Sequence, residues 1–113
     1  MLHVITREEE ALAEIYAVVD GTDLHAVAAK SASIVETLKT AREKIHDLFG
    51  PVGVCLGLET DPEIKTWEQV VVDILIPASI SDAAERLERF DRDWWLTASA
   101  NEPAAICFSL RPV

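Results

Sequence analysis

Apolar residues in the first half of the chain recur every three to four positions, which is the spacing of one helical face. The first such series comprises Leu12, Ile15, Tyr16 and Val19. Thr6 followed by Glu9 has the spacing of a capping box, in which each side chain binds the other residue's backbone N–H. Gly21 is suited to ending a helix, because glycine readily adopts the left-handed conformation. We therefore predict a helix from Thr6 to about residue 20.

The pattern predicts a second, longer helix that starts after Thr22 or Asp23 and runs to about Leu48, before Gly50. Its inner positions alternate in steps of four and three, as in a heptad repeat; they are Val27, Ser31, Ile34, Leu38, Ala41, Ile45 and Leu48. A helix of about 25 residues is about 37 Å long. Strands of average length are shorter than this. We therefore expect part of this helix to pack on the first helix or on another chain.

The second half changes to the alternating pattern of strands. Residues 52–58, 69–76 and 104–110 are predicted strands, and a helix is predicted from Ser79 or Ser81 to about Trp95. The predicted fold class is α+β, in a single domain over residues 1–113: an N-terminal helical hairpin (1–50) and a β-β-α-β unit (51–113).

The three strands are predicted to form a mixed sheet with helices on one face. The first two strands pair antiparallel, and the last two are parallel, because a β-α-β unit makes a crossover. These last two strands are either adjacent or separated by a strand from another segment, in a ferredoxin-like arrangement.

Alternate residues of a strand share a face of the sheet, so the strands predict two different faces. One face is large and aliphatic, which helices must cover. The other is mostly small: Gly53, Cys55, Gly57, Glu59, Val71, Asp73, Leu75, Ala105, Cys107 and Ser109. Glycine and alanine on a pleated surface allow another backbone or a ligand to approach closely. Three interpretations remain open: a solvated face, a face buried against a second subunit, and the floor of a small-molecule site.

Asp73 is the main titratable candidate on this small-residue face, because it lies in the middle of the most apolar strand. Burying a carboxylate is costly unless it is paired or hydrogen-bonded. Cys55 and Cys107 are on the same face and are interpreted as small buried residues. Together with Gly53, Gly57 and Ser109 they form the candidate ligand or interface set. We predict no metal site and no cofactor, because no Cys-x-x-Cys or His-x-x-x-His spacing occurs.

Adjacent residues on a helix point about 100° apart, so Trp94 and Trp95 are not expected to face the same core. We place Trp94 in the core with Leu87 and Phe90. Trp95 is expected at the edge of the core or at a contact surface, where tryptophan is enriched.

The chain has 113 residues, with 20 acidic and 10 basic side chains and a net charge of −10. This charge repels phosphate backbones and predicts no nucleic-acid binding. It favours solubility or a basic protein partner.

No segment has the ~18 consecutive apolar residues of a membrane span. The N-terminus has no signal-peptide pattern. Two cysteines do not make a disulfide framework. We therefore expect no membrane association and a cytoplasmic location.

Asp61-Pro62-Glu63, a β-branched strand and the helix end Phe90-Asp91-Arg92-Asp93-Trp94-Trp95 together resemble a set of small bacterial α+β proteins of similar length. The resemblance covers roughly residues 49–110. It implies a fold, and no established activity is associated with that set.

Three functions from different classes are compatible with these features. The first is a non-enzymatic protein-interaction module that self-associates as a homodimer or larger oligomer. The second is an acidic, antidote-like protein that binds a basic partner. The third is a small-molecule binder or enzyme that uses the sheet face around Asp73. The sequence lacks nucleophile-elbow, phosphate-loop and HExxH motifs, which favours a protein that is not an enzyme.

Overall fold

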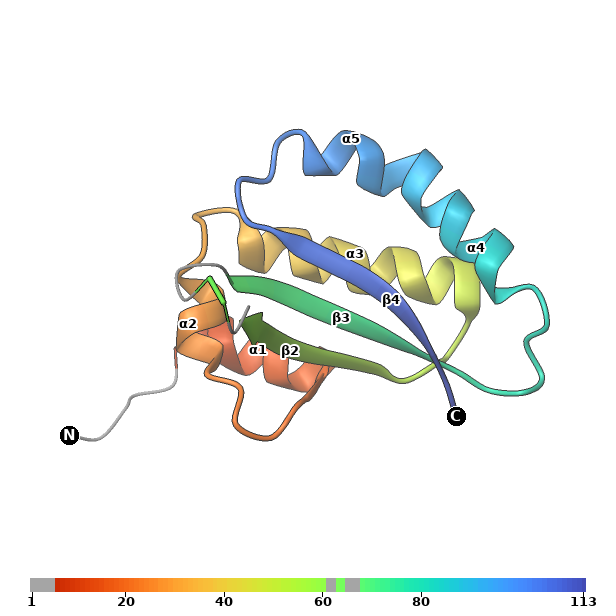
Figure 1. The fold of residues 1–113 in the computed structure, drawn as a ribbon, viewed down its shortest axis with the longest axis horizontal. Coiled ribbons are helices and arrows are strands. Elements are labelled where there is room, and N and C mark those ends of the chain that lie inside the picture. Colours follow the sequence, from red (N-terminus) through yellow and green to blue (C-terminus); the bar gives the residue numbers. More distant parts are fainter. Residues whose placement is uncertain (1–5, 61–62, 65–67) are drawn as a thin grey trace.

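Helices and a mixed sheet alternate along the chain in the computed structural model, which describes residues 6–60, 63–64 and 68–113 (Figure 1). The predicted loop motif Asp61-Pro62 lies outside the described residues. The elements in chain order are α1 (Arg7–Ile15), β1 (Ala17–Val18), α2 (Leu24–Ala28), α3 (Ile34–Phe49), β2 (Val54–Thr60), β3 (Glu68–Ile76), α4 (Ala83–Phe90), the π-helical segment η1 (Asp91–Trp95), α5 (Leu96–Ser99) and β4 (Ile106–Pro112).

The sheet has four strands in the order β1-β2-β3-β4. The predicted α+β class, the antiparallel β2–β3 pair and the parallel β3–β4 pair are confirmed. The predicted number of three strands is wrong, because β1 pairs with β2 in parallel. The ferredoxin-like alternative is also wrong, since β3 and β4 are direct neighbours with no strand between them.

The first helix starts as predicted and ends earlier. Thr6 Oγ1 accepts a hydrogen bond from Glu9 N at 3.2 Å, and the Glu9 carboxylate accepts one from Thr6 N at 2.7 Å, which completes the capping box. The helix ends at Ile15, and Tyr16 is already extended. Val19 therefore does not belong to the helical face. Ala17 and Val18 instead pair with β2, a long-range contact that the local period does not reveal.

The predicted long helix is two helices, α2 and α3. Asp23 caps α2 as predicted, its Oδ1 accepting from His25 N at 2.9 Å. Where the chain leaves the helical path between them, Ser31 and Ser33 donate their hydroxyls to the Glu102 carboxylate. The 16 residues of α3 span about 24 Å, close to the length of a seven-residue strand. The overlong helix that predicted packing on a second chain is therefore absent.

The predicted inner face of this helix pair is confirmed as core, and it packs within the chain. Figure 1 shows α3 behind the strands, with the α4–α5 segment running above β4. The fully buried side chains of α3 meet the predicted aliphatic face of the sheet; they include Ile34, Leu38, Ala41 and Ile45 from the helix and Leu56, Val70, Val72 and Ile74 from the strands. Hydrophobic burial between these layers is the main source of stability.

Both tryptophans contact β4, so the expectation that they face different surroundings is wrong. Trp94 and Trp95 are half-buried, with ring centroids 6.5 and 4.9 Å from that of Phe108. The cause is η1, where Leu96 N donates to the carbonyl of Asp91, five residues earlier. This wider turn changes the angle between neighbouring side chains. Trp95 lies at the edge of the core, which was one of its two predicted positions.

Candidate functional site

The residues of the predicted small-residue face do lie on one face of the sheet. We call it the open face, and it comprises Gly53, Cys55, Gly57, Val71, Asp73, Leu75, Cys107 and Ser109. Their register places Cys55, Asp73 and Ser109 in one row across the three strands. Gly57, Val71 and Cys107 form the next row. Cys55, Asp73, Cys107 and Ser109 are only partly exposed, and both cysteines are free thiols.

Asp73 finds its hydrogen-bond donor inside its own chain. The Ser109 hydroxyl, on the neighbouring strand β4, donates to Asp73 Oδ1. The carboxylate is partly exposed and so remains partly solvated. The hydrogen bond from Ser109 and the remaining contact with water explain how a charged residue is tolerated in an otherwise aliphatic strand.

The two glycines of the open face make room for neighbouring side chains of the same chain. A Cβ at Gly57 would lie 3.4 Å from Val19 Cγ2 and 3.9 Å from Thr22 Oγ1. A Cβ at Gly53 would lie 3.1 Å from Leu75 Cδ1, which is tighter than ordinary van der Waals contact. These positions are therefore explained by internal packing, and they do not require a ligand.

An acidic hollow of about 620 Å³ lies at one end of the open face. Gly57, Val71 and Asp73 contribute to it from the strands, and residues 19–23 form its wall. Five carboxylate side chains line it: Asp20, Asp23, Glu59, Glu68 and Asp73. Three of them have structural partners, since Lys30 pairs with Glu68, Asp23 caps α2 and Ser109 donates to Asp73. Among the described residues, no group of three or more His, Cys, Asp or Glu side chains has the arrangement of a metal site.

A second hollow, of about 540 Å³, lies beside the outer edge of β4; it is lined by Gln69, Asp91, Trp95, Leu96, Ser99, Ile106, Cys107 and Phe108. Trp95 and Cys107, two of the predicted candidate residues, therefore line the same hollow. Leu96 is unusually exposed for its type, at 71%. Burial raises the pKa of the Asp91 carboxyl above its usual range. Sequence reasoning missed Asp91, because adjacent acidic residues are common on solvated helices.

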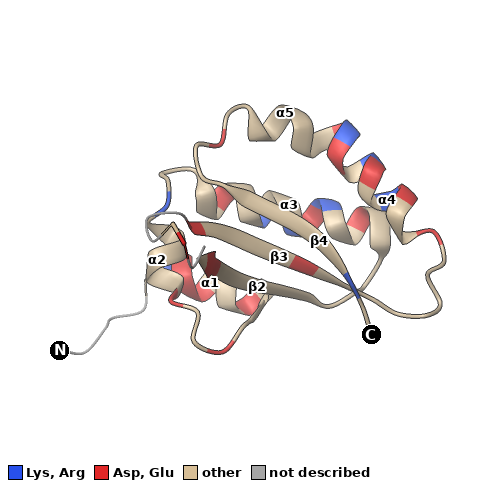
Figure 2. Ribbon diagram, in the orientation of Figure 1, with Lys and Arg blue, Asp and Glu red and all other residues tan. Residues whose placement is uncertain are grey.

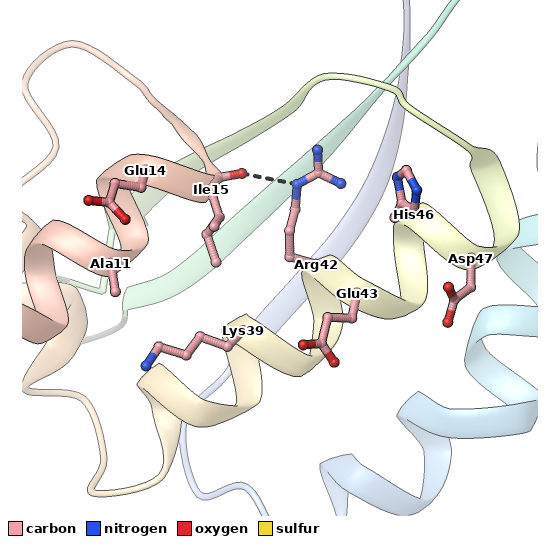
Figure 3. Close-up of a pocket in the computed structure, with 8 residues that line it drawn as sticks. All are labelled: Ala11, Glu14, Ile15, Lys39, Arg42, Glu43, His46 and Asp47. Atoms are coloured by element: carbon pink, nitrogen blue, oxygen red, sulfur yellow. Dashed lines mark hydrogen bonds between the residues drawn. The ribbon is translucent and has the colours of Figure 1, made fainter.

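The groove between α1 and α3, with a volume of about 640 Å³, contains mixed charges (Figure 3). Arg42 reaches from α3 to the end of α1, where its Nε donates to the Ile15 carbonyl at 3.0 Å. Its Nη2 donates to the Val52 carbonyl, also at 3.0 Å. Its Nη1 is buried and has no hydrogen-bond partner among the described residues. Arg42 thus connects three segments of the fold.

Sequence reasoning also missed Glu102, a buried carboxylate that joins the loop before β4 to the start of α3. Its Oε1 accepts from Ser33 Oγ at 2.8 Å and from Thr37 Oγ1 at 2.7 Å. Its Oε2 accepts from Ser31 Oγ at 2.6 Å and from Ala104 N at 2.9 Å. Burial acts to raise the pKa of this carboxyl, but the four donors outweigh burial and hold the pKa below its usual range.

Comparison of the chain with protein-family models, with curated proteins and with solved structures gives no match. No helix among the described residues is both long and apolar enough to cross a membrane. The assignment of a function therefore depends on the geometry above.

Proposed function

We propose that this protein is a non-enzymatic interaction module that associates with a second copy of itself. The observation that carries the proposal is the uneven covering of the sheet. The aliphatic face is buried under α3 and its neighbours, while Cys55, Asp73, Cys107 and Ser109 of the open face stay partly exposed and β4, the last strand of the sheet, pairs only with β3. A hydrophobic edge strand in this situation tends to acquire a partner, because its unpaired backbone groups are a template for another strand.

The charges on the surface are compatible with this proposal. Acidic residues are spread over helices, loops and the strands β2 and β3 (Figure 2), and the β4 edge is lined mainly by apolar and small side chains. Ile106, Cys107 and Phe108 of the edge strand, with Trp95 beside them, are the residue types that are favoured at protein interfaces or tolerated there.

The test is the molar mass of the purified protein at tens of micromolar, measured by light scattering in physiological salt. Self-association predicts at least twice the chain mass of 12.5 kDa. A monomer mass under these conditions would contradict the proposal. It would direct attention to the acidic hollow and to a basic partner, which would be tested by pull-down from the native host.

A further inference from the structure

The hollow beside β4 lies between two walls that come from different parts of the chain. Strands β3 and β4 form one wall, and the segment from η1 to α5, which runs above β4, forms the other (Figure 1). Its volume is about 540 Å³. Pockets that hold small molecules have volumes of about 300–1,000 Å³. The hollow therefore has room for a small molecule.

Much of the lining of this hollow is apolar. Ile106 and Phe108 contribute from β4, and Trp95 and Leu96 contribute from the opposite wall. Trp95 packs against Phe108 edge to face, with ring centroids 4.9 Å apart. Leu96 keeps 71% of its surface exposed. A ligand with an apolar body would remove this surface from water, which is favourable.

The wall formed by η1 has a rare backbone geometry. Leu96 N donates to the carbonyl of Asp91, five residues earlier, where an α-helix would use the residue four positions earlier. Asp91, Trp95 and Leu96 all line the hollow, so the wider turn presents residues at both of its ends to the same space. Single π-helical turns inside helices occur frequently at functional sites. The backbone of η1 therefore points to a site here independently of the hollow itself.

Asp91 is the one charged side chain among the described residues that line the hollow. Burial raises the pKa of its carboxyl, and within the described part of the chain no cation or hydrogen-bond donor offsets that effect. Asp93, on the same segment, differs, because one of its carboxylate oxygens lies 3.6 Å from Arg92 Nε. A partly desolvated carboxylate without a partner is stabilised by a positive charge placed beside it. The ligand that complements this hollow therefore carries a positive charge.

We propose that the hollow binds a small organic cation, whose ammonium group pairs with the Asp91 carboxylate and whose apolar body lies against Trp95 and Leu96. The net charge of −10 attracts cations to the protein and repels anions. An ammonium group close to Trp95 also gains from the negative face of the indole ring. Every residue of this site belongs to one chain, so the site does not depend on self-association.

The test uses phenethylammonium as the probe and phenethyl alcohol as its neutral analogue of similar shape. Binding is followed by NMR through the indole N–H signals of the isotope-labelled protein, and the Trp95 signal is identified by its absence in Trp95→Phe. The cation should shift the Trp95 signal saturably. The alcohol should bind more weakly, on the order of fivefold to tenfold, because hydrogen bonds to charged groups are the stronger ones.

A matched pair of variants separates Asp91 from the general negative charge of the protein. Asp91→Asn and Asp93→Asn each remove one negative charge from the same segment, but only Asp91 lines the hollow. Asp91→Asn should weaken binding of phenethylammonium on the order of fivefold to tenfold. Asp93→Asn should weaken it by about twofold at most, because salt screens exposed charges. Circular dichroism verifies that both variants are folded.

Each outcome decides the matter. A preference for the cation that is lost in Asp91→Asn and kept in Asp93→Asn supports the site. Equal losses in the two variants would overturn it, since the acidic surface as a whole would then attract the probe. Equal affinity for the cation and the alcohol, or no saturable shift of the Trp95 signal, would also overturn it. The comparison of the two ligands uses the unmodified chain, so it holds even if a variant does not fold.

Discussion

The two faces of the sheet come from the same three long strands, yet they differ sharply in burial. Val54, Leu56 and Ile74 on the covered face are 0–3% exposed. Their neighbours Cys55, Asp73 and Leu75 on the open face are only half-buried. Since hydrophobic stabilisation scales with the apolar area removed from water, the covered face accounts for most of the folding free energy. Residues on the open face and the β4 edge are correspondingly less constrained by folding and more available for association.

The largest effect should come from the covered face, at Leu38 of α3. Leu38 is fully buried, and its carbonyl also accepts the Tyr16 hydroxyl at 2.6 Å. Leu38→Ala should lower the free energy of unfolding by about 2–5 kcal/mol, the range for large-to-small changes in cores. Urea melts measure this, with exposed Glu43→Ala on the same helix as the control, expected within about 0.5 kcal/mol of wild type. A loss below about 0.5 kcal/mol for Leu38→Ala would contradict the assignment of this face to the core.

The covered face was largely predictable because its information is local. The step of three and four residues that identified Ile34, Leu38 and Ala41 reports which side of a helix is apolar, wherever that side packs. The alternation around Val72 likewise reports which side of the strand is buried. Neither pattern indicates where a helix is interrupted. The buried positions were therefore assigned correctly even though the prediction of one long helix was wrong.

Features that depend on distant residues were not predictable in this way. The break between α2 and α3 is bound by Glu102, which is 71 positions from Ser31. The strand β1 exists only because β2 is available to pair with it. The candidate site shows the same division: the alternation placed Asp73, Cys55 and Cys107 on one face, but it did not show that Ser109 supplies the donor to Asp73.

The buried carboxylate Glu102 should give the second largest effect. It is 7% exposed and accepts four hydrogen bonds. Glu102→Gln should lower the free energy of unfolding by about 1–3 kcal/mol at pH 7, because hydrogen bonds to charged groups are the stronger ones. An amide has only one oxygen, so it replaces one acceptor by a donor. Exposed Glu36→Gln is the control and should change little.

The effect of Glu102 also has a predicted pH dependence. The folded-state pKa is lowered, so the carboxylate's contribution is fully present above the unfolded-state pKa. It is lost as the pH falls through the lower, folded-state value. Urea melts across acidic pH should therefore show the difference between wild type and Glu102→Gln narrowing as the pH decreases. A difference that stays constant, or that widens on acidification, would contradict the network as the source of the stability.

The smallest effect on the free energy of unfolding is expected from Asp73 on the open face. This variant tests whether the open face is buried against another chain. Asp73 lies on β3, one strand inside the edge, and it is hydrogen-bonded by Ser109 of the same chain. Asp73→Asn keeps an oxygen that accepts from that hydroxyl, and the side chain remains partly solvated. The variant should therefore change the free energy of unfolding by less than about 0.5 kcal/mol and should leave the molar mass at tens of micromolar unchanged. Ser109→Ala provides the matched comparison, because it removes the donor and leaves the carboxylate to water. If Asp73→Asn instead dissociated the proposed oligomer, the carboxylate would be meeting a donor on a second chain. The open face, rather than the β4 edge, would then be the interface.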